Sequence, residues 1–178
     1  MKDEHKEFLL KAGAGQVSHS GRTLFDHLSG TYELLKSWGN KEVICVAGLF
    51  HSVYGTQTFA CHLIDRDQRN GVAGVIGVEA ERLVFLFCNC DRDCFFENIG
   101  SDEILLVDKV QRRLVDVSTD ILRALVEIEI ANILEQIPHK TKISSEVMRT
   151  YVDQCGAART IISTEACRHM TNVFGCFQ

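Results

Sequence analysis

Residues 41–56, KEVICVAGLFHSVYGT, decide the fold class. Residues 41–51 are apolar almost throughout, so this segment suits either a buried strand or a buried helix. We predict a helix, because the segments on both sides carry helical patterns. His51 ends the apolar segment and the small polar residue Ser52 follows at once. Polar groups at the end of a core element raise the question of a functional site.

Helical patterns cover most of the remaining chain. Thr23 can cap a helix over 24–38, which Gly39 ends. The clearest helix, 119–137, begins at a Ser118 or Thr119 cap and stops at Pro138, the single proline of the chain. Further helices are expected at 3–12, 77–90, 102–112, 143–155 and 156–170, with loops at 11–23 and 91–102 and a polar connection at 52–71. The pattern predicts an all-α fold.

Composition bounds the class of protein. A chain of 178 residues suits one domain, so we expect a single domain over residues 1–178. A net charge of −5 argues against a general nucleic-acid binder or a membrane-surface binder, since both need a basic face. No apolar run has the length of a membrane span, and the first residues, MKDEHKEF, lack the features of a secretory signal. We therefore expect a cytoplasmic protein.

The chain contains eight cysteines. Without a secretory signal, most are expected to be reduced and partly buried small hydrophobic residues. Cys88, Cys90 and Cys94 form the single cluster, and Cys88 ends an apolar, helix-like run. Structural zinc favours cysteine pairs in loops, so this cluster favours a packing role. Redox sensitivity of the cluster stays open.

A stripe of polar residues accompanies the apolar face of the 119–137 helix. Glu129, Asn132 and Gln136 are spaced i, i+3 and i+7, which places them on one side of the helix. The stripe suits a solvated surface equally well as the wall of a pocket that also contains His27 and His51. A single histidine on a helix is more often structural than a ligand, so the two histidines alone do not decide between these interpretations.

Residues 15–137 resemble the HD-domain hydrolases that degrade guanosine tetraphosphate. The resemblance lies in GQVSHSGRTLFDHLSGTYELLKSWGNKEVICVAGLFHSVYGTQT, GVEAERLVFLF and EIEIANILEQI, which occur in the order of that family. The phrases DHLSGT and AGLFHSVYGT are also similar to an HD-like domain family of unknown function, which implies a fold more than an activity. The resemblance implies an HD-domain-like helical bundle, followed by a C-terminal helical extension at 140–178.

The resemblance also implies a degenerate metal site. The two histidine ligands of the family fall on His27 and His51, and its last aspartate ligand falls on Asn132. The aspartate after the second histidine falls on Ser52. Replacing carboxylates by neutral groups weakens binding of manganese or magnesium, whereas iron, zinc or nickel still accepts imidazole.

Other positions of the family fall on further candidates. The acidic pair that helps to activate water falls on Gly55 and Thr56, and the arginine of the opening loop, which supports nucleotide binding, falls on Arg22. His19 is a candidate third ligand. Glu129, one turn before Asn132, is a candidate for the missing carboxylate and for a catalytic role. The implied cofactor is one divalent metal ion: iron, zinc, manganese or nickel.

Three functions remain open from the sequence. The first is an HD-like enzyme with an altered metal site that acts on a small anionic substrate, such as a nucleotide or a phosphorylated molecule, with hydrolysis favoured over oxidation. The second is a metal-free pocket, lined by Arg22, His19, His27, His51, Tyr54 and Gln136, that binds a small molecule or in which a histidine and Tyr54 perform acid–base chemistry. The third is an inactive interaction protein. The substrate-binding candidates are His19, Arg22, Ser52, Thr56 and Gln136. A homodimer through the C-terminal extension is a further alternative.

Overall fold

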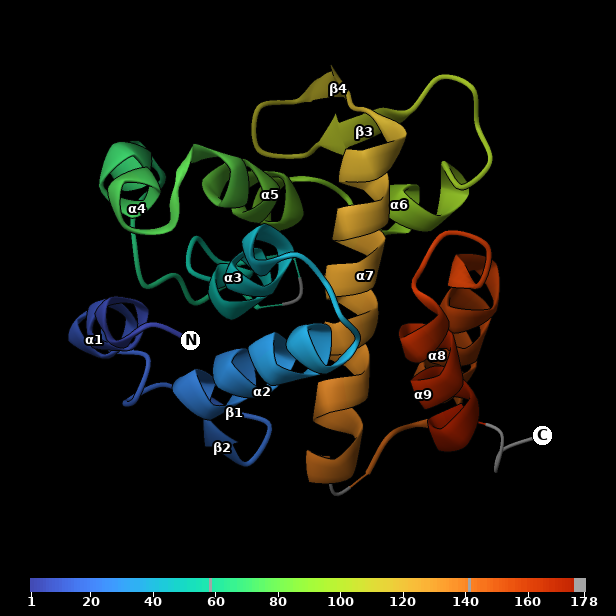
Figure 1. Ribbon diagram of the computed structural model, residues 1–178, viewed down its shortest axis with the longest axis horizontal. Helices are drawn as coiled ribbons and strands as arrows, with labels where there is room; N and C mark the ends of the chain where they lie inside the picture. Colours follow the sequence, from blue (N-terminus) through green and yellow to red (C-terminus); the bar gives the residue numbers. More distant parts are fainter. Residues whose placement is uncertain (58, 141, 175–178) are drawn as a thin grey trace.

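The computed structural model describes residues 1–57, 59–140 and 142–174. The fold is mostly helical (Figure 1). The helices are α1 (Asp3–Lys11), α2 (Leu24–Ser37), α3 (Glu42–Phe50), α4 (Arg69–Ile76), α5 (Val78–Asn89), α6 (Asp93–Glu97), α7 (Thr119–Gln136), α8 (Ser145–Ala158) and α9 (Thr164–Phe174), with short 3-10 turns at Arg66–Gln68 and Ile137–His139. Within these residues, no helix combines the length and the apolar composition that crossing a membrane requires.

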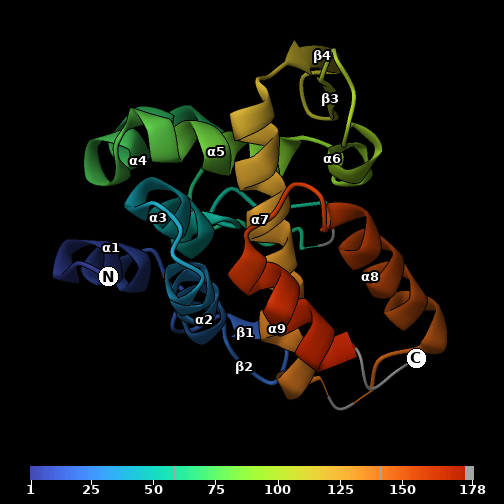
Figure 2. The ribbon, with the colours of Figure 1, turned by 45° about the vertical axis from the view of Figure 1, so that its right-hand side comes forward.

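Helix α7 runs through the middle of the molecule (Figures 1 and 2). Helices α2, α3 and α5 pack on one side of it, and α8 and α9 pack on the other. Every residue from Ala124 to Glu135 is buried, including the polar ones. Because α7 is enclosed on several sides, the polar residues at its surface must find partners inside the protein.

The apolar segment 41–51 forms a helix, α3, as predicted. Helix α3 buries Cys45 through Phe50, so it is apolar around most of its circumference. Gly48 lets α3 approach α2 closely, because a Cβ atom there would collide with the side chain of Leu35. This close approach brings the end of α3, and with it His51, next to α2.

The predicted helix starts at 24 and 119 are confirmed by side-chain caps. The Thr23 hydroxyl accepts from the amide of Asp26 at 3.1 Å, and the Asp26 carboxylate accepts from the amide of Thr23 at 3.2 Å. Ser118 caps α7 through the amide of Ile121. Gly39, with φ +77°, follows the end of α2.

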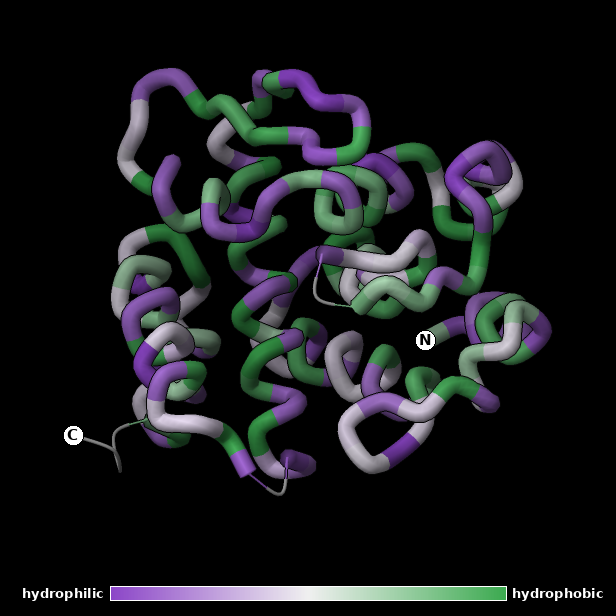
Figure 3. Tube along the Cα trace, turned by 180° about the vertical axis from the view of Figure 1, so that it is seen from behind, coloured by the Kyte–Doolittle hydropathy of each residue, from purple (hydrophilic) through white to green (hydrophobic). Residues whose placement is uncertain are grey.

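The prediction of a helix over 102–112 is wrong. The antiparallel strands β3 (Leu105–Asp108) and β4 (Arg113–Asp116) form a hairpin there instead. The Asp108 carboxylate accepts from the amides of Val110 and Gln111, which stabilises the turn. This turn is mostly hydrophilic (Figure 3). The fold is therefore mostly α rather than all-α.

Other boundaries also differ from the prediction. The helix expected at 77–90 begins at Val78, because Gly77 has φ +84° and separates it from α4, which begins at Arg69, near the end of the expected connection 52–71. The loop 91–102 contains α6. The loop 11–23 contains two-residue strands, β1 (Ser18–His19) and β2 (Arg22–Thr23). The C-terminal extension forms α8 and α9.

Candidate functional site

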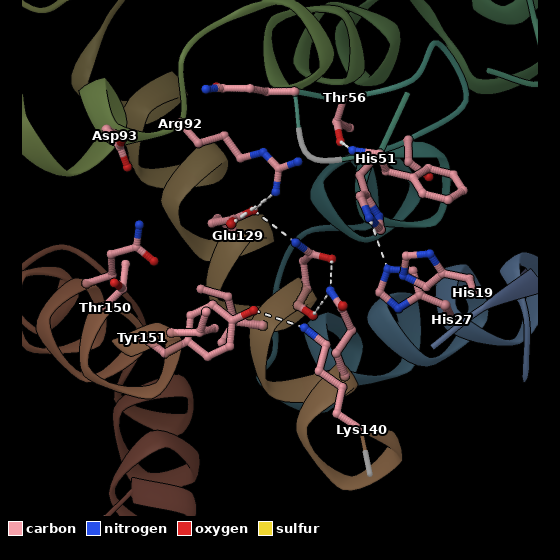
Figure 4. A pocket seen from close by; sticks show the side chains of 18 of the residues that line it. His19, His27, His51, Thr56, Arg92, Asp93, Glu129, Lys140, Thr150 and Tyr151 are labelled. Atoms are coloured by element: carbon pink, nitrogen blue, oxygen red, sulfur yellow. Dashed lines mark hydrogen bonds and ion pairs between the residues drawn. The ribbon is translucent and has the colours of Figure 1, made fainter. Parts of the chain in front are cut away.

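A cavity of about 410 Å³ lies between α7, α8 and the end of α3 (Figure 4). Most of the candidate site residues from the sequence line it, and they come from the opening loop, α2, the end of α3 and α7. These residues are His19, His27, His51, Ser52, Thr56, Glu129, Asn132 and Gln136. The predicted polar stripe of α7 thus faces a cavity. Arg22 and Tyr54 do not line it.

The centre of the site is a pair of buried histidines. The Nε2 atoms of His27 and His51 lie 3.2 Å apart. The Nδ1 atom of His51 donates to the carbonyl oxygen of Gly48 at 2.7 Å, and the Nδ1 atom of His27 contacts the carboxylate of Glu135. Since both Nδ1 atoms carry the donor proton, the two Nε2 lone pairs face each other. Such an arrangement is stable when a proton or a metal ion lies between them.

Burial favours the neutral form of both imidazoles. Desolvation lowers the pKa of His51 to about 3, and a hydrogen bond to the Gly48 carbonyl offsets part of this effect. Desolvation, followed by the charges of His51, His19 and Arg22, also lowers the pKa of His27 strongly. Asn132 acts on both rings as a hydrogen-bonding partner that raises their pKa values. Asn132 lines the same cavity as both histidines.

From the lowered pKa values of the histidine pair, we expect the free energy of unfolding to fall in acid. In the unfolded chain a histidine takes up its proton near pH 6.5, whereas folded His51 does so only near pH 3. The unfolded state therefore binds more protons between these values, and stability falls as the pH drops below about 6.5. The expected loss is about 1.4 kcal/mol per pH unit for each such histidine. Urea unfolding of the metal-free protein between pH 7 and pH 5 measures this slope.

A matched pair of variants assigns the acid sensitivity. His51→Gln should flatten the pH dependence, because it removes one of the buried titrating groups. His62→Gln, at a side chain that is 55% exposed, should leave the dependence as it is in the wild type. Equal slopes in all three proteins would contradict the prediction.

Glu135 is a member of the site that the sequence interpretation missed. Its side chain is buried, one carboxylate oxygen contacts His27 and the other forms an ion pair with Arg22. Gly30 makes room for this carboxylate, since a Cβ atom at Gly30 would lie 2.9 Å from the Glu135 Cγ. One signal was available, because Glu135 lies three residues after Asn132 and so near the same side of α7.

Arg22 and Tyr54 differ from their predicted roles. Arg22 was expected to contact substrate, but its guanidinium pairs with Glu135 behind His27. The prediction that Tyr54 lines the pocket is wrong: its ring is fully buried and its hydroxyl donates to Glu81 at 3.1 Å. The chain turns directly after α3, which directs Tyr54 into the core beside α5 rather than toward His51.

Glu129 lines the cavity but is engaged elsewhere. Its carboxylate accepts from Arg92 at 3.0 and 3.1 Å and from the Asn132 amide nitrogen at 3.0 Å. His19 stacks on His27, with ring centroids 4.4 Å apart. Among the described residues, no three His, Cys, Asp or Glu side chains group as metal ligands, so neither Glu129 nor His19 completes such a set with the histidine pair.

The structure adds residues that themselves carried no functional signal in the sequence. They are Gln57, Phe59, Asp91, Arg92, Asp93, Ile133, Lys140, Val147, Thr150, Tyr151 and Gln154. The four residues from α8 are spaced i, i+3, i+4 and i+7, which is one face of a helix. This face is mixed in polarity, so its orientation toward a cavity could not be deduced from hydrophobic periodicity.

Comparison with known proteins gives one likeness. A family model described as a domain of unknown function (DUF6817) matches residues 8–92. No curated protein matches the chain, and no solved structure does. The chain is thus similar to this family from within α1 to Arg92, a segment that contains His19, His27 and His51 but not the polar stripe of α7.

Proposed function

We propose that the chain is an enzyme on an HD-like helical scaffold, which binds one divalent metal ion and hydrolyses a small anionic substrate. The observation that carries the proposal is the opposition of two imidazole Nε2 atoms 3.2 Å apart at the wall of a cavity. The resemblance of residues 15–137 to HD-domain hydrolases supports the choice of hydrolysis over oxidation.

The donor set fits a transition metal ion. Imidazole nitrogens bind zinc at about 2.0–2.1 Å, so two of them at tetrahedral or right angles lie roughly 2.9–3.4 Å apart. The observed separation of 3.2 Å falls within this range. His27 and His51 would hold the ion together with Asn132. A set of two imidazoles and an amide favours iron, zinc or nickel over magnesium.

The groups behind the histidines also fit. Metal-bound histidines commonly donate their second N–H to a carboxylate or a carbonyl, which fixes the ring. Here Glu135 accepts from His27, and the Gly48 carbonyl accepts from His51. When bound, a divalent ion lowers the pKa of a coordinated water and polarises a substrate oxygen.

Other residues at the cavity orient the Asn132 side chain or offer a hydrogen bond to the substrate. Arg92 and Glu129 hold the Asn132 side chain from one side, and Gln136 donates to its carbonyl oxygen at 2.9 Å from the other. The Ser52 hydroxyl is buried at the cavity wall without a hydrogen-bond partner in the described chain. Ser52 therefore has a free donor for a substrate oxygen.

A metal-free enzyme is the second candidate, and the same distance supports it. A separation of 3.2 Å also suits an N–H···N hydrogen bond, in which the two rings share one proton. Glu135 would then stabilise that proton from behind His27. The two candidates differ in whether the purified protein contains metal.

Metal content measured by plasma mass spectrometry tests the proposal. Protein purified without a histidine tag should contain close to one equivalent of iron, zinc, manganese or nickel. The His27→Ala/His51→Ala variant should contain none, whereas the control variant His62→Ala, which removes an exposed histidine that does not line the cavity, should keep the metal. Wild-type protein that neither contains a metal ion nor takes one up on reconstitution would refute the metal site and leave the shared-proton enzyme.

A further inference from the structure

The cavity has a second wall that lies outside the HD-like resemblance. Val147, Thr150, Tyr151 and Gln154 form one face of α8 and line the cavity. Figure 4 shows Thr150 and Tyr151 on this wall, across the cavity from His27 and His51. Lys140, from the segment between α7 and α8, lies below them. The cavity therefore has a histidine end and an α8 end.

Most charges at the cavity are already balanced within the protein. Arg92 pairs with Glu129 at 3.0 Å, and Asp91 pairs with Lys109 at 2.5 Å. Asp93 is exposed and lies across the cavity from Lys140 (Figure 4). Lys140 therefore sets the charge of the α8 end of the cavity.

Lys140 has a neutral partner. Its ammonium donates to the Tyr151 hydroxyl at 3.0 Å and lies 5.4 Å from the centre of the same ring. Within the described residues, no carboxylate lies at ion-pair distance from Lys140. An ammonium has three N–H donors, so Lys140 can bind further acceptors while Tyr151 fixes its position.

The same cavity joins Lys140 to the histidine end, because Lys140, His27 and His51 all line it. His19 stacks on His27, which belongs to the histidine pair. A small molecule can therefore contact Lys140 and the histidine pair at the same time, within a cavity of about 410 Å³.

We propose that Lys140 and Tyr151 form an anion subsite, which binds the terminal phosphate or carboxylate of the substrate while the bond to be cleaved lies at the histidine pair. This inference rests on the proposed function for the position of the chemistry. It names the substrate class as small molecules with one terminal anionic group. It also assigns α8, from the C-terminal extension, to substrate recognition.

Titration of the full-length protein with inorganic phosphate and with acetate tests the subsite. Amide shifts in ¹H–¹⁵N NMR spectra, recorded with a chelator present, give the Kd of each anion. One of the two anions should bind saturably to the wild type. Lys140→Gln should weaken that binding at least tenfold, and Tyr151→Phe should weaken it severalfold, because the hydroxyl that positions the ammonium is lost.

The control removes an equal charge two residues away. Lys142 is exposed and does not line this cavity, so Lys142→Gln should keep the wild-type Kd within twofold. Circular dichroism of each variant checks that it is folded. Absence of saturable binding of both anions, or equal weakening by Lys140→Gln and Lys142→Gln, would overturn the subsite.

The two anions distinguish the substrate classes, and a further variant separates the two proposals. Tighter binding of phosphate supports a phosphorylated substrate, and tighter binding of acetate supports a carboxylate.

The His27→Ala/His51→Ala variant should lose the metal but retain the anion. Loss of anion binding in a folded form of this variant, with Lys140→Gln unaffected, would place the anion at the histidine pair and overturn the subsite alone.

Discussion

Glu135→Ala is expected to lower the free energy of unfolding by about 3–5 kcal/mol, as is usual when one partner of a buried ion pair is removed. The carboxylate is the acceptor for the Nδ1 proton of His27 and the partner of the Arg22 guanidinium. His27 is 1% exposed and cannot turn to water for a replacement acceptor. Urea unfolding at pH 7, with the wild type as reference, measures the loss.

Two further variants separate charge from hydrogen bonding at this position. Glu135→Gln keeps an oxygen that can accept from His27 but loses the charge that pairs with Arg22, so its cost should be intermediate. Glu146→Ala removes an exposed carboxylate at the start of α8 and should change stability by less than about 0.5 kcal/mol. A Glu135→Ala variant as stable as Glu146→Ala would show that Arg22 and His27 find other partners.

The same substitution should act on the site. If His27 is a metal ligand, loss of its carboxylate acceptor should reduce metal affinity by roughly 10–100-fold. Competition with a chromophoric chelator measures this affinity on folded Glu135→Gln, which avoids the larger instability of Glu135→Ala. An unchanged affinity would separate Glu135 from the function of His27 and leave it a structural role.

The helices could be predicted where their signals are local. The Thr23 and Ser118 caps lie beside the residues that they cap, and α7 begins and ends within a residue of the predicted bounds. Helix α3 was predicted from its neighbours rather than from its own composition. The 105–116 hairpin was missed because its turn depends on Asp108 and on the left-handed Arg112, with φ +53°, and neither is a strong turn signal in the sequence.

The cavity could be predicted in part because helical spacing is local. The spacing of Glu129, Asn132 and Gln136 placed them on one side of α7, and the structure turns that side toward His27 and His51. Lys140 and Tyr151 carried no such signal, since their role arises from the way α8 folds back along α7. The position of Tyr54 in the sequence was misleading. Tyr54 lies only three residues after His51, but the chain turns between them and places the Tyr54 ring in a different environment.

The environment of Tyr54 leads to the second large effect, at Glu81. The Glu81 side chain is 4% exposed and accepts from Tyr54 at 3.1 Å and from Arg69 at 2.7 and 2.6 Å. Burial and the Glu81 carboxylate both raise the pKa of Tyr54, so the phenol stays protonated as a donor. Glu81→Ala would strand this buried hydroxyl, at about 1–3 kcal/mol, and remove charged hydrogen bonds worth about 1.5–3 kcal/mol.

The expected loss for Glu81→Ala is therefore about 3 kcal/mol or more, against about 1 kcal/mol for Tyr54→Phe, which keeps the ring and the Glu81–Arg69 pair. The partial exposure of Arg69, at 37%, limits the cost on its side, because the guanidinium can regain water. Neither variant touches the cavity, so folded Tyr54→Phe should keep the wild-type metal content and the wild-type Kd for the anion that binds. Loss of metal or of anion binding in Tyr54→Phe would show that Tyr54 contributes to the site.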